Sequence, residues 1–265
     1  IILRAGSSPA PGTNLMNHFI FFHGVGIRSP FWNSIVPKLK SESINYTLVD
    51  LDFSSLDSAF KSSIESVRTL MKEHPERNFV LVGHSLGGLF AVYVAQQLGD
   101  AIHKLIIVNT GLAPKRVAMK AMQQMQINFL SKFLKKIGMR MLFRGQLPKW
   151  LTKSLFFTDD TPDHVKWELS KHKIRENRTF LMEHFNSKKI WNSHLERIHF
   201  SGPDNVLSVF GSKDKTTPKS AFINLANLLN ASQSIYQGSG HNDIITADKY
   251  NDKFVKEIIL FADNV

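Results

Sequence analysis

The sequence predicts an α/β fold in which helices flank a mostly parallel sheet, with a helical segment inserted between two of the strands. Three observations lead to this prediction. Strand-like and helix-like patterns alternate along most of the chain, which is typical of parallel sheets joined by crossover helices. A Gly-x-Ser-x-Gly motif stands where a strand pattern passes into a helix pattern. A basic stretch from residue 113 to 195 has helical patterns and no clear strand pattern.

Six short runs of the sequence predict the strands. The run at residues 18–22 is apolar and ends at turn residues, as expected of a buried strand. The first run ends at His23-Gly24, and the third ends at Gly83. The predicted strands are residues 18–22, 46–51, 78–82, 104–108, 206–210 and 232–236.

Helical spacing of apolar residues fills most of the gaps between these runs. In one of them Phe60, Ile64, Val67 and Met71 recur at intervals of three and four, which places them on one helix face. The predicted helices of the α/β core are residues 31–39, 57–73, 86–98, 220–229 and 244–261.

Length and composition bound the class of protein. The chain has 265 residues, is 43% hydrophobic and contains no cysteine, so a disulfide scaffold, a thiolate metal site and a cysteine nucleophile are excluded. No apolar run approaches the ~18 residues of a membrane helix, and no signal-peptide pattern is seen, which favours the cytoplasm. Residues 1–15 resemble a linker-like extension or tag, with Met16 as the natural start.

The positive charge is concentrated in the middle of the chain. The formal net charge of the chain is +11. Residues 113–195, with 17 basic and 6 acidic residues, account for all of this charge. A basic surface attracts an anionic membrane or an acidic carrier protein. No nucleic-acid recognition motif accompanies the charge, so no nucleic acid is expected as a partner.

The segment Gly83-His84-Ser85-Leu86-Gly87 lies between a predicted strand and a predicted helix. Such a sharp turn strains the serine backbone and requires glycine beside it, where side chains would collide. The turn places the Ser85 hydroxyl at the carboxyl edge of the sheet, where open α/β sheets bind ligands. We therefore interpret Ser85 as a nucleophile.

At these residues the chain resembles the α/β-hydrolase family, and the resemblance extends from Met16 to the C-terminus. The family carries an acid and a histidine on loops after later strands, in the order serine, acid, histidine. Gly211-Ser212-Lys213-Asp214, with Pro218 four residues later, is similar to the acid loop. Gly238-Ser239-Gly240-His241 is similar to the histidine loop.

A serine hydroxyl is a weak nucleophile at neutral pH and needs a neighbouring base. His241 would take the proton of Ser85, and Asp214 would hold the imidazole in the right tautomer. Asp243 and Asp204 are the alternative acids, although aspartate is also common in turns.

An oxyanion hole needs two fixed donors. The backbone N–H of Leu86 follows the nucleophile, and the resemblance of His23-Gly24-Val25-Gly26 to the family's histidine-glycine motif implies the N–H of Val25 as the second. His23, Gly24 and His84 are candidate substrate-binding residues.

The resemblance also has departures. The family begins with a hairpin before the first predicted strand, but nothing strand-like precedes His18, so we expect the hairpin to be missing. The loop after residues 50–52 lacks the glycines often found there.

By the resemblance, residues 112–197 form a helical cap between the two halves of the core, residues 16–111 and 198–265. Met122, Met125 and Phe129 belong to an apolar stripe beside several basic residues. This stripe can pack on the core, lie on an anionic membrane or line a pocket for acyl chains. 

The leading hypothesis is a serine hydrolase of carboxylic esters, similar to esterases and lipases, that acts on a small-molecule ester and needs no metal or organic cofactor. The alternatives are an acyl-thioesterase or acyltransferase for carrier-bound acyl groups, and a ligand-binding protein without catalysis. The fold alone does not decide among these chemistries.

Overall fold

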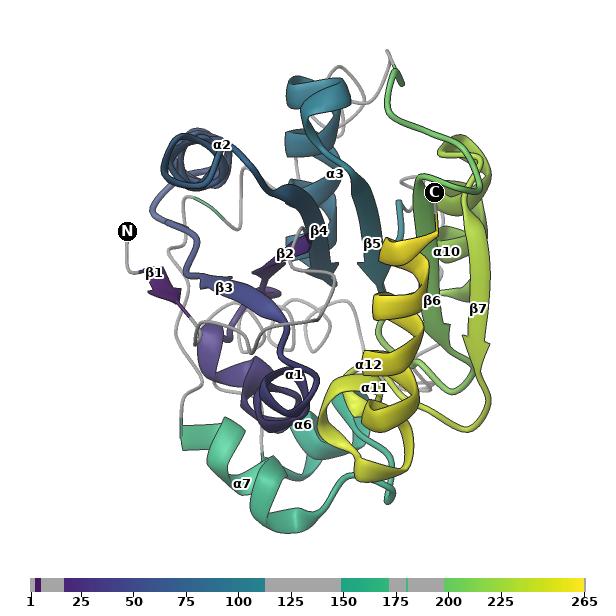
Figure 1. Cartoon of the computed structure of the whole chain (residues 1–265). Coiled ribbons are helices and arrows are strands. Elements are labelled where there is room, and N and C mark those ends of the chain that lie inside the picture. The colour runs from purple at the N-terminus through teal and green to yellow at the C-terminus, as the bar shows by residue number, and fades with distance from the viewer. Residues whose placement is uncertain (1–2, 6–16, 113–148, 172–179, 181–197, 265) are drawn as a thin grey trace.

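The computed structural model describes residues 3–5, 17–112, 149–171, 180 and 198–264, and Figure 1 shows their arrangement. A sheet of seven strands has the order β1-β3-β2-β4-β5-β6-β7. All neighbouring pairs from β3 to β7 are parallel, which confirms the predicted α/β fold. The strands are β1 Leu3–Ala5, β2 Asn17–Phe22, β3 Asn45–Val49, β4 Asn78–His84, β5 Lys104–Val108, β6 Val206–Gly211 and β7 Ser232–Tyr236.

One expectation about the start of the chain was wrong. We expected no strand to precede His18, but Leu3–Ala5 pairs with β3 in antiparallel register, Leu3 opposite Val49. An exposed strand edge offers unpaired N–H and C=O groups to any extended segment that passes it. Three residues are too few for a hydrophobic period, so the sequence pattern could not show this strand.

Helices cover both faces of the sheet, because neighbouring residues of each strand point to opposite sides. Ile20 and Phe22 pack with α2, α3 and α10, whereas Phe19 and Phe21 pack with η1, α1, α11 and α12. Figure 1 shows α12 in front of the sheet and α3 behind it. The helices are η1 Ser29–Ser34, α1 Val36–Ser41, α2 Leu56–Glu73, α3 Leu86–Leu98, η2 Gly99–Ala101, α10 Lys219–Leu228, α11 Asp243–Thr246 and α12 Asp248–Asp263.

Part of the predicted cap is described. Helices α6 (Lys149–Phe156) and α7 (Asp163–Lys171) lie beyond the end of the sheet to which the arrows of β5 and β7 point (Figure 1). Phe180 is buried and stacks on the ring of Phe53 at 4.5 Å between centroids. Met122, Met125 and Phe129 lie outside the described residues, and the cap boundaries at 112 and 197 stay a prediction.

Within the described part of the chain, no helix combines the length and the apolar character that crossing a membrane requires.

Candidate active site

Ser85 stands in a strained turn between β4 and α3. Its backbone has φ 54° and ψ −124°, a conformation that residues other than glycine rarely adopt. A Cβ on Gly83 would lie 2.4 Å from the Cα of Gly88, and a Cβ on Gly87 would lie 2.3 Å from the carbonyl oxygen of His23. The predicted need for glycine at both positions is therefore confirmed.

The neighbouring strand β5 fixes this turn. The N–H of Ser85 donates to the carbonyl of Val108 at 2.9 Å. The hydroxyl of Thr110 donates to the carbonyl of Ser85 at 3.0 Å. These two bonds hold the N–H and the C=O of Ser85, so the surrounding structure maintains the strained backbone conformation. Sequence reasoning did not single out Thr110, although it follows a strand at the carboxyl edge of the sheet.

The three residues predicted as a catalytic set lie together. Nε2 of His241 is 3.0 Å from Oγ of Ser85, and Nδ1 of His241 is 2.6 Å from Oδ2 of Asp214. An ionised carboxylate can only accept, so Nδ1 carries the proton and Nε2 is left as an acceptor for the serine hydroxyl. This is the tautomer in which the imidazole can serve as a base.

The Asp214 carboxylate is buried and fully hydrogen-bonded. Oδ1 accepts from the N–H and hydroxyl of Thr216, both at 2.7 Å, and from the N–H of Thr217 at 3.0 Å. Burial by itself would raise the pKa of Asp214. The charge of His241 and the hydrogen bonds from His241, Thr216 and Thr217 together outweigh burial and hold that pKa below its usual value. Asp214 is therefore ionised beside the imidazole at neutral pH.

The two alternative acids lie elsewhere. Asp243 directs its carboxylate to Gly240, Thr158 and Thr161. Asp204 is exposed and precedes β6, whereas Asp214 follows it. The two ends of β6 belong to opposite edges of the sheet, so Asp204 is remote from Ser85.

Asn109 is a site residue that sequence reasoning missed. It follows β5 with φ 47°, and its Nδ2 donates to the carbonyl of His241 at 2.6 Å. Its Oδ1 accepts from the N–H of Gly211 at 2.8 Å. One buried amide thus joins the end of β6, which precedes Asp214, to the histidine loop. The available indication was a polar residue at the end of a central parallel strand, the same type of position as Ser85.

His84 and His23 are buried beneath the site. Nε2 of His84 donates to the carbonyl of His241 at 2.9 Å. Burial, and next the charge of His241, lower the pKa of His84 to about 3. His84 thus supports the histidine loop as a neutral ring.

His23 is fully buried, with Nδ1 donating to the carbonyl of Gly24 at 2.8 Å and Nε2 accepting from the N–H of Leu51 at 3.1 Å. Burial is the main reason why its pKa falls to about 4. With both nitrogens bonded to backbone, His23 shapes the loop after β2, and its role in substrate binding stays a prediction.

The loop after β2 passes directly against Ser85. A Cβ on Gly24 would lie 3.1 Å from Cβ of Ser85 and 3.3 Å from Nδ1 of His84. Val25 follows and is 38% exposed, while Leu86 is the first residue of α3. Gly24, which precedes Val25, and Leu86, which follows Ser85 in the chain, thus bring both backbone segments expected to supply oxyanion donors beside Ser85.

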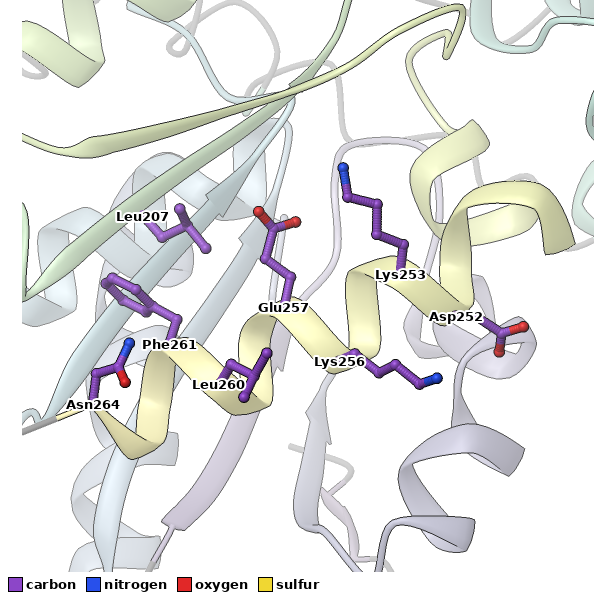
Figure 2. A pocket seen from close by; sticks show the side chains of 8 residues that line it. All are labelled: Leu207, Asp252, Lys253, Lys256, Glu257, Leu260, Phe261 and Asn264. Atoms are coloured by element: carbon purple, nitrogen blue, oxygen red, sulfur yellow. The ribbon is translucent and has the colours of Figure 1, made fainter.

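A separate hollow of about 640 Å³ runs along α12 from Asp252 to Asn264, with Leu207 of β6 on its wall (Figure 2). None of the candidate catalytic residues lines it. Within the described ranges, no group of three His, Asp or Glu side chains is arranged to hold a metal ion.

The sequence profile of the alpha/beta hydrolase fold matches residues 17–248. The chain belongs to the α/β-hydrolase family. Known proteins of this fold resemble it at two levels, in sequence over part of the chain and in structure over nearly all of it.

In sequence, this α/β-hydrolase family member is 30% identical over 115 residues to the pimeloyl-acyl-carrier-protein methyl ester esterase of Vibrio cholerae serotype O1. That alignment covers 43% of this chain and 44% of the esterase. The matched part spans less than half the length of the curated relatives.

In structure, the monoacylglycerol lipase of Paleococcus ferrophilus has a TM-score of 0.66 at 17% identity, covering 100% of this chain and 99% of that one. A hydrolase from Oleispira antarctica has a TM-score of 0.67 at 16% identity, covering 97% and 94%. At these identities the likeness shows the fold alone.

Proposed function

We propose that the protein is a serine hydrolase of carboxylic esters. One observation carries the proposal: Oγ of Ser85, the imidazole of His241 and the carboxylate of Asp214 form a continuous hydrogen-bonded chain, with 3.0 Å and 2.6 Å between partners. The name of the esterase relative supports the same class of reaction.

In the first half of the reaction, Oγ of Ser85 attacks the ester carbonyl carbon while Nε2 of His241 takes the hydroxyl proton. The tetrahedral intermediate collapses with loss of the alkoxide, which receives that proton from His241. Asp214 stabilises the imidazolium between these two transfers. An acyl group is then attached to Ser85, and the alcohol has left.

In the second half, His241 takes a proton from water, whose oxygen attacks the acyl carbonyl. Collapse breaks the bond to Ser85, and His241 returns the proton to Oγ, so that a carboxylic acid leaves and the enzyme is restored. The N–H groups of Leu86 and Val25 are the proposed donors to the oxyanion in both halves. The close passage of Gly24 beside Ser85 supports this assignment.

The test is hydrolysis of p-nitrophenyl esters from acetyl to palmitoyl, with Ser85→Ala as the matched variant. We expect turnover by the wild type and background rates with Ser85→Ala, while circular dichroism shows both folded. Equal turnover by the two proteins would contradict the proposal. Failure of a folded wild type to react with a fluorophosphonate would favour the ligand-binding alternative.

A second candidate is action on an acyl group linked to an acidic carrier protein, as an ester hydrolase, acyl-thioesterase or acyltransferase. Two observations favour it: the esterase relative is named for a carrier-bound ester, and residues 113–195 have a net charge of +11. Attraction between exposed charges is screened by salt. Carrier-bound substrate should therefore show a KM that rises steeply with ionic strength, whereas p-nitrophenyl acetate should not.

An anionic membrane surface is the other partner that a basic cap could bind. Vesicles with and without anionic lipid distinguish this case, because only the anionic vesicles should then sediment with the protein.

A further inference from the structure

The carboxyl group of Asp243 is buried and surrounded by hydrogen-bond donors. Its Oδ2 accepts from the N–H of Gly240 at 2.7 Å and from the hydroxyl and N–H of Thr158 at 2.6 and 3.0 Å. Its Oδ1 accepts from the hydroxyl of Thr161 at 2.6 Å. Asp243 is fully buried, and in the described part of the chain it forms no ion pair with a Lys, Arg or His side chain.

This environment explains why the residue is an aspartate. An ionised carboxylate accepts at both oxygens, whereas an asparagine amide would turn a donor toward other donors. Burying a charge without a cation is costly, even when hydrogen bonds satisfy it. The four donor groups belong to two separate segments, the histidine loop and residues 156–161 at the end of α6 and beyond it. The Asp243 carboxylate therefore joins these two segments.

The two segments also meet at His241 itself. The N–H of Asn242 donates to the carbonyl of Phe156 at 2.9 Å. The ring of Phe156 lies 5.7 Å from the ring of His241, between centroids. On its other side the same loop is held by Asn109 and His84, which both donate to the His241 carbonyl. The imidazole is therefore fixed between the sheet and residues 156–161, which begin at the last residue of α6.

We propose that Asp243 is a positioning residue that locks the histidine loop to the segment of residues 156–161 and thereby sets the position of the His241 imidazole. The inference rests on the proposed function for its kinetic consequence, but not for its structural one. By this proposal, the packing of residues 156–161 on the sheet edge also places the His241 base correctly. Figure 1 shows α6 beside α11, where the lock lies.

The principal variants are Asp243→Asn and the pair Thr158→Val and Thr158→Ser. Asparagine keeps the shape of Asp243 and loses an acceptor. Valine removes the Thr158 hydroxyl with little change of volume, while serine keeps it. The matched control is Lys249→Met, which removes an exposed ion pair between α12 and Asp160 and leaves Asp243 untouched.

Two readouts are needed. The first is kcat and KM for p-nitrophenyl acetate across pH. The second is the downfield proton resonance of the His241 Nδ1–H···Asp214 hydrogen bond, which reports the imidazole position without turnover. Because misplacement of a catalytic group by about 1 Å can cost about 10²-fold, we expect Asp243→Asn to lower kcat by roughly 10- to 100-fold and to shift the resonance. Thr158→Val should change both in the same direction, and Thr158→Ser and Lys249→Met should match the wild type.

A folded Asp243→Asn protein with wild-type kcat and an unmoved resonance would overturn the inference. If Asp243→Asn does not fold, the Thr158 pair decides, and equal kcat and equal resonances for Thr158→Val and Thr158→Ser would overturn it. Absence of Ser85-dependent turnover in the wild type would refute the proposed function instead, and the resonance would still test the lock.

Discussion

The side-chain amide of Asn109 and the backbone carbonyl of His241 meet at 2.6 Å although 132 residues separate them in the chain. The same amide accepts from the N–H of Gly211 at 2.8 Å, three residues before Asp214. A single side chain at the end of β5 thus sets the spacing between the loops that carry the candidate acid and base.

Replacement of Asn109 should impair both stability and turnover. Asn109→Gly keeps the left-handed backbone but leaves the buried N–H of Gly211 unpaired, which costs about 1–3 kcal/mol of unfolding free energy. Asn109→Ala should be less stable still, because alanine at φ 47° is strained. Urea denaturation and kcat for a p-nitrophenyl ester measure both effects. Wild-type kcat in Asn109→Gly would show that the loop spacing does not depend on this amide.

Ser85→Gly should remove ester turnover and raise stability by about 1 kcal/mol, because glycine adopts the strained backbone of the turn freely. Ser43→Gly is the matched control, since Ser43 has φ 57° outside the site. It should also stabilise the protein, with turnover unchanged. Thermal denaturation and active-site titration check both variants. A Ser85→Gly protein less stable than the wild type would mean that the turn holds no strain that glycine can release.

Asp214→Asn should lower kcat by a factor of about 10⁴, because the amide can donate to Nδ1 of His241 and favour the tautomer that cannot accept the serine proton. Asp204→Asn, at an exposed position before β6, should leave kcat unchanged. Single-turnover acylation measured for both variants separates this effect from substrate binding. Loss of activity in Asp204→Asn together with retention in Asp214→Asn would reverse the assignment of the acid.

Three buried histidines predict a loss of stability in mild acid. Burial is the largest cause that lowers the pKa of His18 and His23 to about 4 and that of His84 to about 3, from 6.5. The unfolded chain therefore binds more protons than the folded one below pH 6.5. The unfolding free energy should be at its full value above this pH and fall as pH drops toward 4. Each histidine contributes a slope of up to about 1.4 kcal/mol per pH unit.

Urea denaturation between pH 7.5 and pH 4.5, on a roughly half-unit grid, measures this slope. His199→Gln is the control, because it changes an exposed ring and keeps the three buried ones. A constant unfolding free energy from pH 7 to pH 4.5 would show that the buried rings do not stay neutral.

Much of the fold and of the site followed from local patterns. Six strands were predicted, and each corresponds to one of the six parallel strands. Ser85, Asp214 and His241 follow β4, β6 and β7, and in a parallel sheet these strand ends share one edge. Local patterns could not predict contacts between distant segments whose residues have weak local preferences, such as the pairing of Leu3–Ala5 with β3.

The sequence by itself determined where the chain turns and which residue types occupy the turns, because steric exclusion at Gly83 acts within a few residues, against Gly87 and Gly88. The tertiary structure decided which groups meet. In the folded chain Asp214, and not Asp243, is hydrogen-bonded to the His241 ring. His23 and His84 lie buried beneath the site, and Asn109 lies between two loops. These choices depend on contacts between segments up to 157 residues apart, and such contacts form only when the sheet brings its strand ends to one edge.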